Sequence, residues 1–108
     1  MTTTMKGLPA LALLACLLAP VPASAHSALC SCFDNGDGTV TCEGGFSDGS
    51  SAAGVRVFVR NAADATVARG KMDANGEFTF DKPQGDYTVI FDAGPGHQVE
   101  INGNAIVE

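Results

Sequence analysis

The chain contains no tryptophan, a single tyrosine and only two histidines, and basic residues are few. Lys and Arg number six against twelve Asp and Glu. All twelve acidic residues lie beyond residue 25, together with five basic ones, so residues 26–108 carry a net charge near −7. A chain this acidic, without a basic patch, is not expected to bind nucleic acid, because such binding depends on cationic contacts with phosphates.

Motifs of common enzyme classes are also missing. The chain has no G-x-S-x-G turn, no spacing typical of a Ser–His–acid triad and no phosphate-binding loop. Oxidative enzymes built on a copper-binding terminal histidine usually present an aromatic platform to substrate, and only Tyr87 could contribute one here. We therefore expect a binding protein and not an enzyme, and a copper oxidative enzyme is the least favoured alternative.

Long hydrophobic runs are confined to the first residues, which have the layout of a secretory signal peptide. Lys6 precedes an apolar run over residues 8–18, and prolines follow it. Ala23-Ser24-Ala25 then fits the A-x-A pattern of a cleavage site. The run is short for a membrane span, and no later segment is long enough for one. Residues 1–25 are predicted to be a signal peptide.

Cleavage after Ala25 would make His26 the first residue of a periplasmic or secreted protein. The alternative is a lipoprotein that begins at Cys16. It is disfavoured because Leu14 is bulky at a position where a small residue is usual, and because the apolar run continues past Cys16.

Three cysteines remain after this cleavage: Cys30, Cys32 and Cys42. An oxidising compartment favours a disulfide, and we predict Cys32–Cys42 because the segment between them has the pattern of a hairpin. Cys30 is then an unpaired thiol. In the alternative interpretation, the three thiolates bind copper(I) or zinc.

Residues 26–108 show no sustained helical periodicity, and turn signals recur about every eight to twelve residues, which is typical of an all-β sandwich or barrel. Val55, Val57 and Val59 are predicted to face inward. Asn102-Gly103 is interpreted as a two-residue hairpin turn. The predicted strands cover residues 28–33, 39–42, 55–60, 65–68, 77–80, 86–91, 99–101 and 105–107. The predicted aromatic core residues are Phe46, Phe58, Phe78, Phe80 and Phe91.

Three phrases carry a resemblance: "SDGSSAAGVRV" (47–57), "MDANGEFTF" (72–80) and "GDYTV" (85–89). Together they resemble the carboxypeptidase regulatory-like, or transthyretin-like, β-sandwich family, although Met72 stands where that family often has threonine. The resemblance implies one domain over residues 26–108. Its expected fold is a seven- to eight-stranded Greek-key sandwich of the immunoglobulin or transthyretin type.

A further phrase, "DAGPGH" (92–97), combined with a mature N-terminal histidine, is similar to the small extracytoplasmic subunit of nickel and cobalt uptake transporters. This resemblance implies transition-metal binding at His26 and His97. It also implies a membrane metal transporter or metal-handling protein as partner.

The residues themselves support the same chemistry. A mature N-terminal His26 offers its α-amine and its imidazole, and His97 adds a third nitrogen, a set that suits nickel, cobalt or copper. Asp92 and Cys30 are secondary candidate ligands. The sequence leaves open whether the two histidines meet. The rival hypothesis is a non-metal β-sandwich module that binds a protein or carbohydrate at the cell surface.

Overall fold

A computed structural model describes residues 26–108 of the chain. The predicted signal peptide over residues 1–25 and the alternative lipidation site at Cys16 lie outside the described residues.

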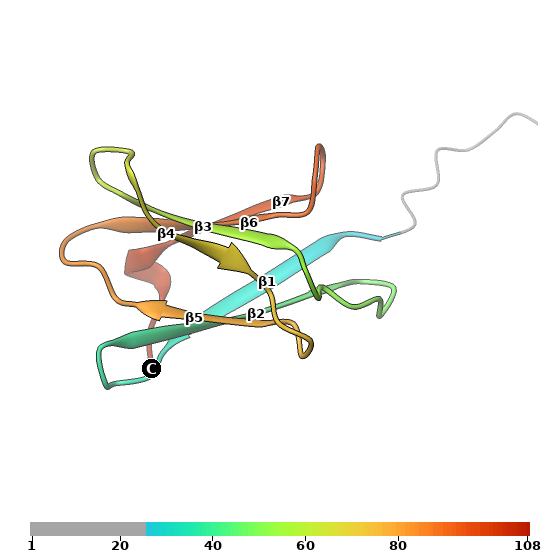
Figure 1. The fold of residues 1–108 in the computed structure, drawn as a ribbon, viewed down its shortest axis with the longest axis horizontal. Helices are drawn as coiled ribbons and strands as arrows, with labels where there is room; N and C mark the ends of the chain where they lie inside the picture. Colours follow the sequence, from blue (N-terminus) through green and yellow to red (C-terminus); the bar gives the residue numbers. More distant parts are fainter. Residues whose placement is uncertain (1–25) are drawn as a thin grey trace, which may run out of the picture.

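The described chain is all-β, with seven strands in two antiparallel sheets (Figure 1). The three-stranded sheet has the order β1-β2-β5, with β1 Ala28–Asp34, β2 Thr39–Phe46 and β5 Glu77–Asp81. The four-stranded sheet has the order β4-β3-β6-β7, with β4 Thr66–Lys71, β3 Arg56–Asn61, β6 Tyr87–Asp92 and β7 Gln98–Asn102.

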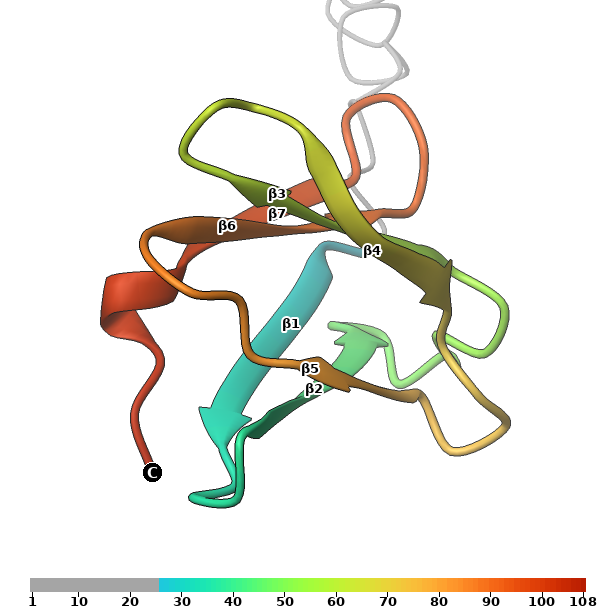
Figure 2. The same cartoon turned by 60° about the vertical axis from the view of Figure 1, so that its left-hand side comes forward.

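A common core fills the space between the two sheets, which form separate layers (Figure 2). Successive side chains of a strand point to opposite faces, so Val57 and Val59 are fully buried, as predicted, while Arg56 is exposed. Val40 and Cys42 face them from β2. The other buried members of the core are Ala52, Met72, Phe80, Tyr87, Val89, Phe91 and Ile106. The prediction of a two-layer all-β fold is confirmed at this level.

Phe58 does not belong to this core, and its assignment as a core aromatic was wrong. It lies between Val57 and Val59 on β3, so it points to the opposite face of the sheet, where it is half-buried. The other four predicted aromatics are buried or pack against the core.

The predicted last strand over residues 105–107 is absent, and Asn102-Gly103 is not a hairpin turn. A 3-10 turn, η2 Gly103–Ala105, follows β7 instead. The Asn102 side chain accepts a hydrogen bond from the backbone N–H of Asn104 and caps this turn. Ile106 then enters the core, and the Val107 carbonyl accepts a hydrogen bond from the Asp34 N–H at the end of β1.

Within residues 26–108, no helix has the length and apolarity needed to cross a membrane.

Candidate metal site

Three segments meet at one end of the molecule, on the right in Figure 1: residues 26–27 at the start of β1, the chain after β2, and the loop between β6 and β7. The first two are fixed together next to the β1–β2 ladder, which begins with the pair Ala28 and Phe46. The Ser27 N–H donates to Ser47 Oγ (2.7 Å), and the Ser47 N–H donates to the Ser27 carbonyl (2.9 Å). These bonds place His26 beside the chain that leaves β2.

His97 is positioned by a tight turn over residues 94–97. The His97 N–H donates to the Gly94 carbonyl (2.9 Å), and the Ala93 N–H donates to the His97 carbonyl (3.0 Å). Gly94 and Gly96 both have positive φ, a conformation that glycine adopts without steric cost. The turn therefore presents His97 at the end of the loop.

The His97 ring is oriented by its own backbone. Nδ1 lies 3.1 Å from the Pro95 carbonyl oxygen. A carbonyl can only accept, so in the neutral ring this bond assigns the proton to Nδ1 and leaves the Nε2 lone pair free. Metal-binding histidines are commonly held in this way, with one ring nitrogen donating to a carbonyl and the other facing the ion.

The structure brings the two predicted histidines together. The rings of His26 and His97 are stacked, with centroids 5.0 Å apart and an interplanar angle of 26°. Phe46 packs edge-on against His26, with ring centroids 5.4 Å apart, and its ring centroid lies 6.3 Å from that of Phe91 in the core. The aromatic contacts thus connect the histidine pair to the buried interior.

A carboxylate stands next to this pair. Oδ2 of Asp48 is 3.8 Å from Nδ1 of His26, and both side chains are about two-fifths exposed. Hydrogen bonds from the Ser50 hydroxyl and N–H, and then the His26 charge, lower the pKa of the Asp48 carboxyl. An ionised carboxylate beside the His26 imidazole, together with the stacked His97 ring, supplies nitrogen and oxygen donors of the kind that suit a divalent transition metal.

Asp48 was not predicted as a site residue, and its sequence context indicated only a polar loop. The register of β1 on β2 is what places it beside His26. The one usable signal was that this loop follows the strand expected to pair with the N-terminal one.

Neither secondary candidate joins the histidine pair. Asp92 accepts a hydrogen bond from the Gly94 N–H (3.0 Å) and contacts the Arg56 guanidinium (3.3 Å). Cys30 lies on β1 beside the disulfide. Within residues 26–108, the two histidines form no group with Asp92, Cys30 or Asp48 in which all the donor atoms lie within 4.8 Å of one another.

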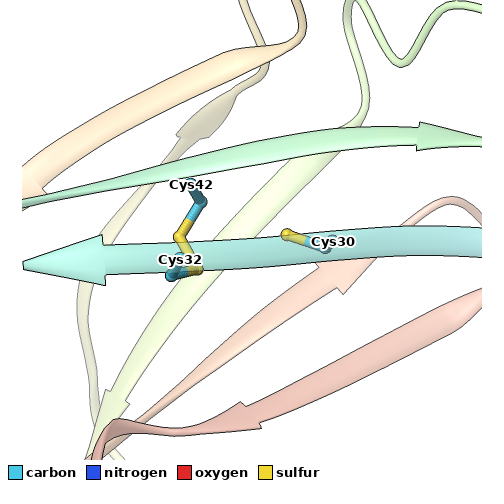
Figure 3. A group of neighbouring side chains, drawn as sticks. All are labelled: Cys30, Cys32 and Cys42. Carbon is cyan, nitrogen blue, oxygen red and sulfur yellow. A yellow bond between two sulfur atoms is a disulfide. The ribbon is translucent and has the colours of Figure 1, made fainter. Parts of the chain in front are cut away.

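The predicted disulfide is confirmed. Cys32 and Cys42 are directly paired residues of β1 and β2, and their sulfurs are bonded (Figure 3). Cys30 is a free, half-buried thiol, and burial raises its pKa to about 11. It therefore stays protonated at neutral pH unless a metal displaces the proton.

No family model matches the chain, and neither the curated proteins nor the solved structures gave a match to it.

Proposed function

We propose that this chain is an exported transition-metal-binding protein, periplasmic or secreted, that captures nickel or cobalt, with copper as the alternative metal. It would serve metal uptake or handling, together with a membrane metal transporter or another metal-handling protein. The observation that carries the proposal is the stacking of His26 on His97 across 71 positions of sequence.

In this proposal, export removes residues 1–25, so that His26 offers its α-amine next to its imidazole. The free Nε2 of His97 supplies a second imidazole, and the Asp48 carboxylate adds negative charge and an oxygen donor. Nitrogen and carboxylate donors suit divalent nickel, cobalt and copper. The metal would require the two rings to turn from their stacked arrangement so that their nitrogens converge.

We also propose the finer fold assignment, a Greek-key sandwich of the transthyretin-like type. It is supported by the path of the chain, which passes between the two sheets after β2, after β4 and after β5. A binding role is preferred to catalysis because Tyr87, the only tyrosine, is buried in the core and cannot serve as a surface platform.

Calorimetric titration of the processed protein with Ni²⁺, Co²⁺ and Cu²⁺ tests the metal site. We expect binding of one ion, weakened at least about tenfold by His97→Ala and by one residue added before His26, because each change removes a nitrogen ligand. Asp48→Asn should weaken binding less. Its matched control is Asp86→Asn, which removes the same charge from the connection between β5 and β6, at the other end of β6.

The ion should also raise the melting temperature of the wild-type protein, as any ligand of the native state does. Affinity that is unchanged in His97→Ala, or in the extended protein, would exclude this site.

A second candidate function is a non-metal interaction module. It is favoured by Leu29 and Phe33, large apolar side chains on β1 that are 52% and 38% exposed. Exposed apolar surface of this kind is typical of protein contacts. This hypothesis predicts that none of the three metals changes the melting temperature.

A further inference from the structure

The three cysteines form a second group of potential ligands. They lie on β1 and β2, and the group shares no residue with the histidine pair. Cys30 and Cys32 are two positions apart on β1, so their side chains lie on the same face of the strand. Cys42 is directly opposite Cys32 on β2. The three sulfurs lie within 4.8 Å of one another (Figure 3).

We propose that this group is a redox-gated binding site for one copper(I) ion, closed while the disulfide is intact. A dithiol reductant opens it by passing two electrons and two protons to the Cys32–Cys42 bond, and is itself oxidised to a disulfide. Three thiols then face one another. Copper(I) binds to their sulfurs and displaces up to three protons.

The spacing of the sulfurs suits this ion. Three thiolates around a metal in one plane, at about 2.3 Å each, stand roughly 4 Å apart from one another. The Cys30 sulfur lies within 4.8 Å of both bonded sulfurs, so the three sulfurs are already close to this spacing before the disulfide opens.

The number and type of donors favour copper(I) over zinc. Structural zinc takes four ligands, whereas this group within residues 26–108 comprises three, all of them sulfur. Thiolates are soft ligands and select copper(I) over the harder divalent ions that imidazole and carboxylate accept. Cys42 is fully buried and Cys30 and Cys32 are half-buried, so the group is largely removed from water.

The third sulfur is the feature that a structural disulfide does not explain. Cys32 and Cys42 alone connect the strands, and Cys30 adds nothing to that connection. Its partner on β2 is Gly44, and the disulfide pair Cys32 and Cys42 occupies a neighbouring position of the same ladder. A third ligand at this position completes a trigonal set.

Titration with copper(I) tests the proposal, using the processed protein with and without a phosphine reductant and a chromophoric copper(I) chelator as competitor. We expect one copper(I) per chain in the reduced protein, with thiolate-to-copper absorption in the ultraviolet, and no such absorption in the oxidised protein. Cys30→Ser should lower the copper(I) affinity of the reduced protein at least about tenfold, because it removes a ligand.

Two controls accompany this titration. Ser31→Ala, between the two β1 cysteines but on the other face of the strand, should leave copper(I) affinity unchanged. His97→Ala should also leave it unchanged, although that variant is expected to bind nickel more weakly, so failure of one site is distinguishable from failure of the other. Equal affinity of reduced wild type and Cys30→Ser, or no binding by the reduced protein, would overturn the proposal.

Amide chemical-shift dispersion reports whether the reduced chain stays folded. Should reduction unfold it, copper(I) must restore the dispersed spectrum in wild type and not in Cys30→Ser. A wild-type spectrum that stays collapsed after copper(I) addition also overturns the proposal.

Discussion

At the residue scale, two adjacent glycines of β2 occupy different surroundings. A Cβ on Gly44 would lie 2.5 Å from Cε2 of Phe91 and 3.1 Å from Cε of Met72, both of them buried core side chains. A Cβ on Gly45 would meet nothing within 4 Å. Neither glycine has a positive φ, so the two positions differ in available space and not in backbone strain.

We therefore expect Gly44→Ala to lower the free energy of unfolding by about 1–3 kcal/mol, because the added methyl overpacks the core against Phe91. Gly45→Ala should stay within about 0.5 kcal/mol of wild type, as surface substitutions usually do. Urea unfolding monitored by circular dichroism measures both variants. Equal stability of the two would contradict this account of the packing at β2.

At the scale of elements, an ion pair joins the end of β1 to the connection between β5 and β6. Lys82 Nζ lies 2.8 Å from Asp34 Oδ2, and the Asp34 side chain is only 13% exposed. Hydrogen bonds from Lys82 and from the Gly36 N–H lower the pKa of the Asp34 carboxyl. The same pair raises the pKa of the Lys82 ammonium.

These shifts give the stabilisation a definite pH range. A lowered carboxyl pKa stabilises the fold above the unfolded value near 3.9, and this contribution disappears as pH falls through the folded pKa. A raised ammonium pKa stabilises the fold below the unfolded value near 10.4, and this contribution disappears as pH rises through the folded pKa. The pair should therefore act fully at neutral pH.

Lys82→Met is accordingly expected to lower the melting temperature at pH 7, and the difference from wild type should vanish at a pH below the folded pKa of Asp34. Calorimetric melting at a series of pH values measures it. Lys71→Met is the matched control, since no ion pair of Lys71 is seen among residues 26–108. A deficit of Lys82→Met that persists unchanged in acid would contradict the assignment.

At the scale of the whole molecule, about 80 residues enclose one small core, and small domains bury too little apolar surface to be very stable. The Cys32–Cys42 disulfide cross-links β1 to β2 across a separation of ten positions. A cross-link restricts the unfolded chain and stabilises the fold relative to it.

Reduction of this disulfide should lower the free energy of unfolding by about 2–4 kcal/mol in metal-free buffer. Urea unfolding with and without a phosphine reductant measures the loss. The Cys30→Ser variant should lose the same amount of stability on reduction as wild type, because the substitution leaves the Cys32–Cys42 bond intact. A reduced protein as stable as the oxidised one would show that the cross-link does not limit stability.

The local features of this protein follow from short stretches of its sequence. Alternating valines specified the buried face of β3, and the glycine and asparagine turns divided the chain into short strands. The hairpin pattern between Cys32 and Cys42 also predicted the disulfide correctly. Each of these features depends on residues within one strand, one turn or one hairpin, where backbone preference and side-chain alternation act independently of the rest of the chain.

Contacts between segments that are distant in sequence arise only in the folded chain. Residues 105–107 lose their predicted strand because Ile106 enters the core and the Val107 carbonyl pairs with Asp34. Asp48 joins the candidate site through the register of β1 on β2, and His97 reaches His26 from the loop that ends β6. Such contacts depend on strand order and on packing that the whole chain must satisfy together, which no single stretch of sequence encodes.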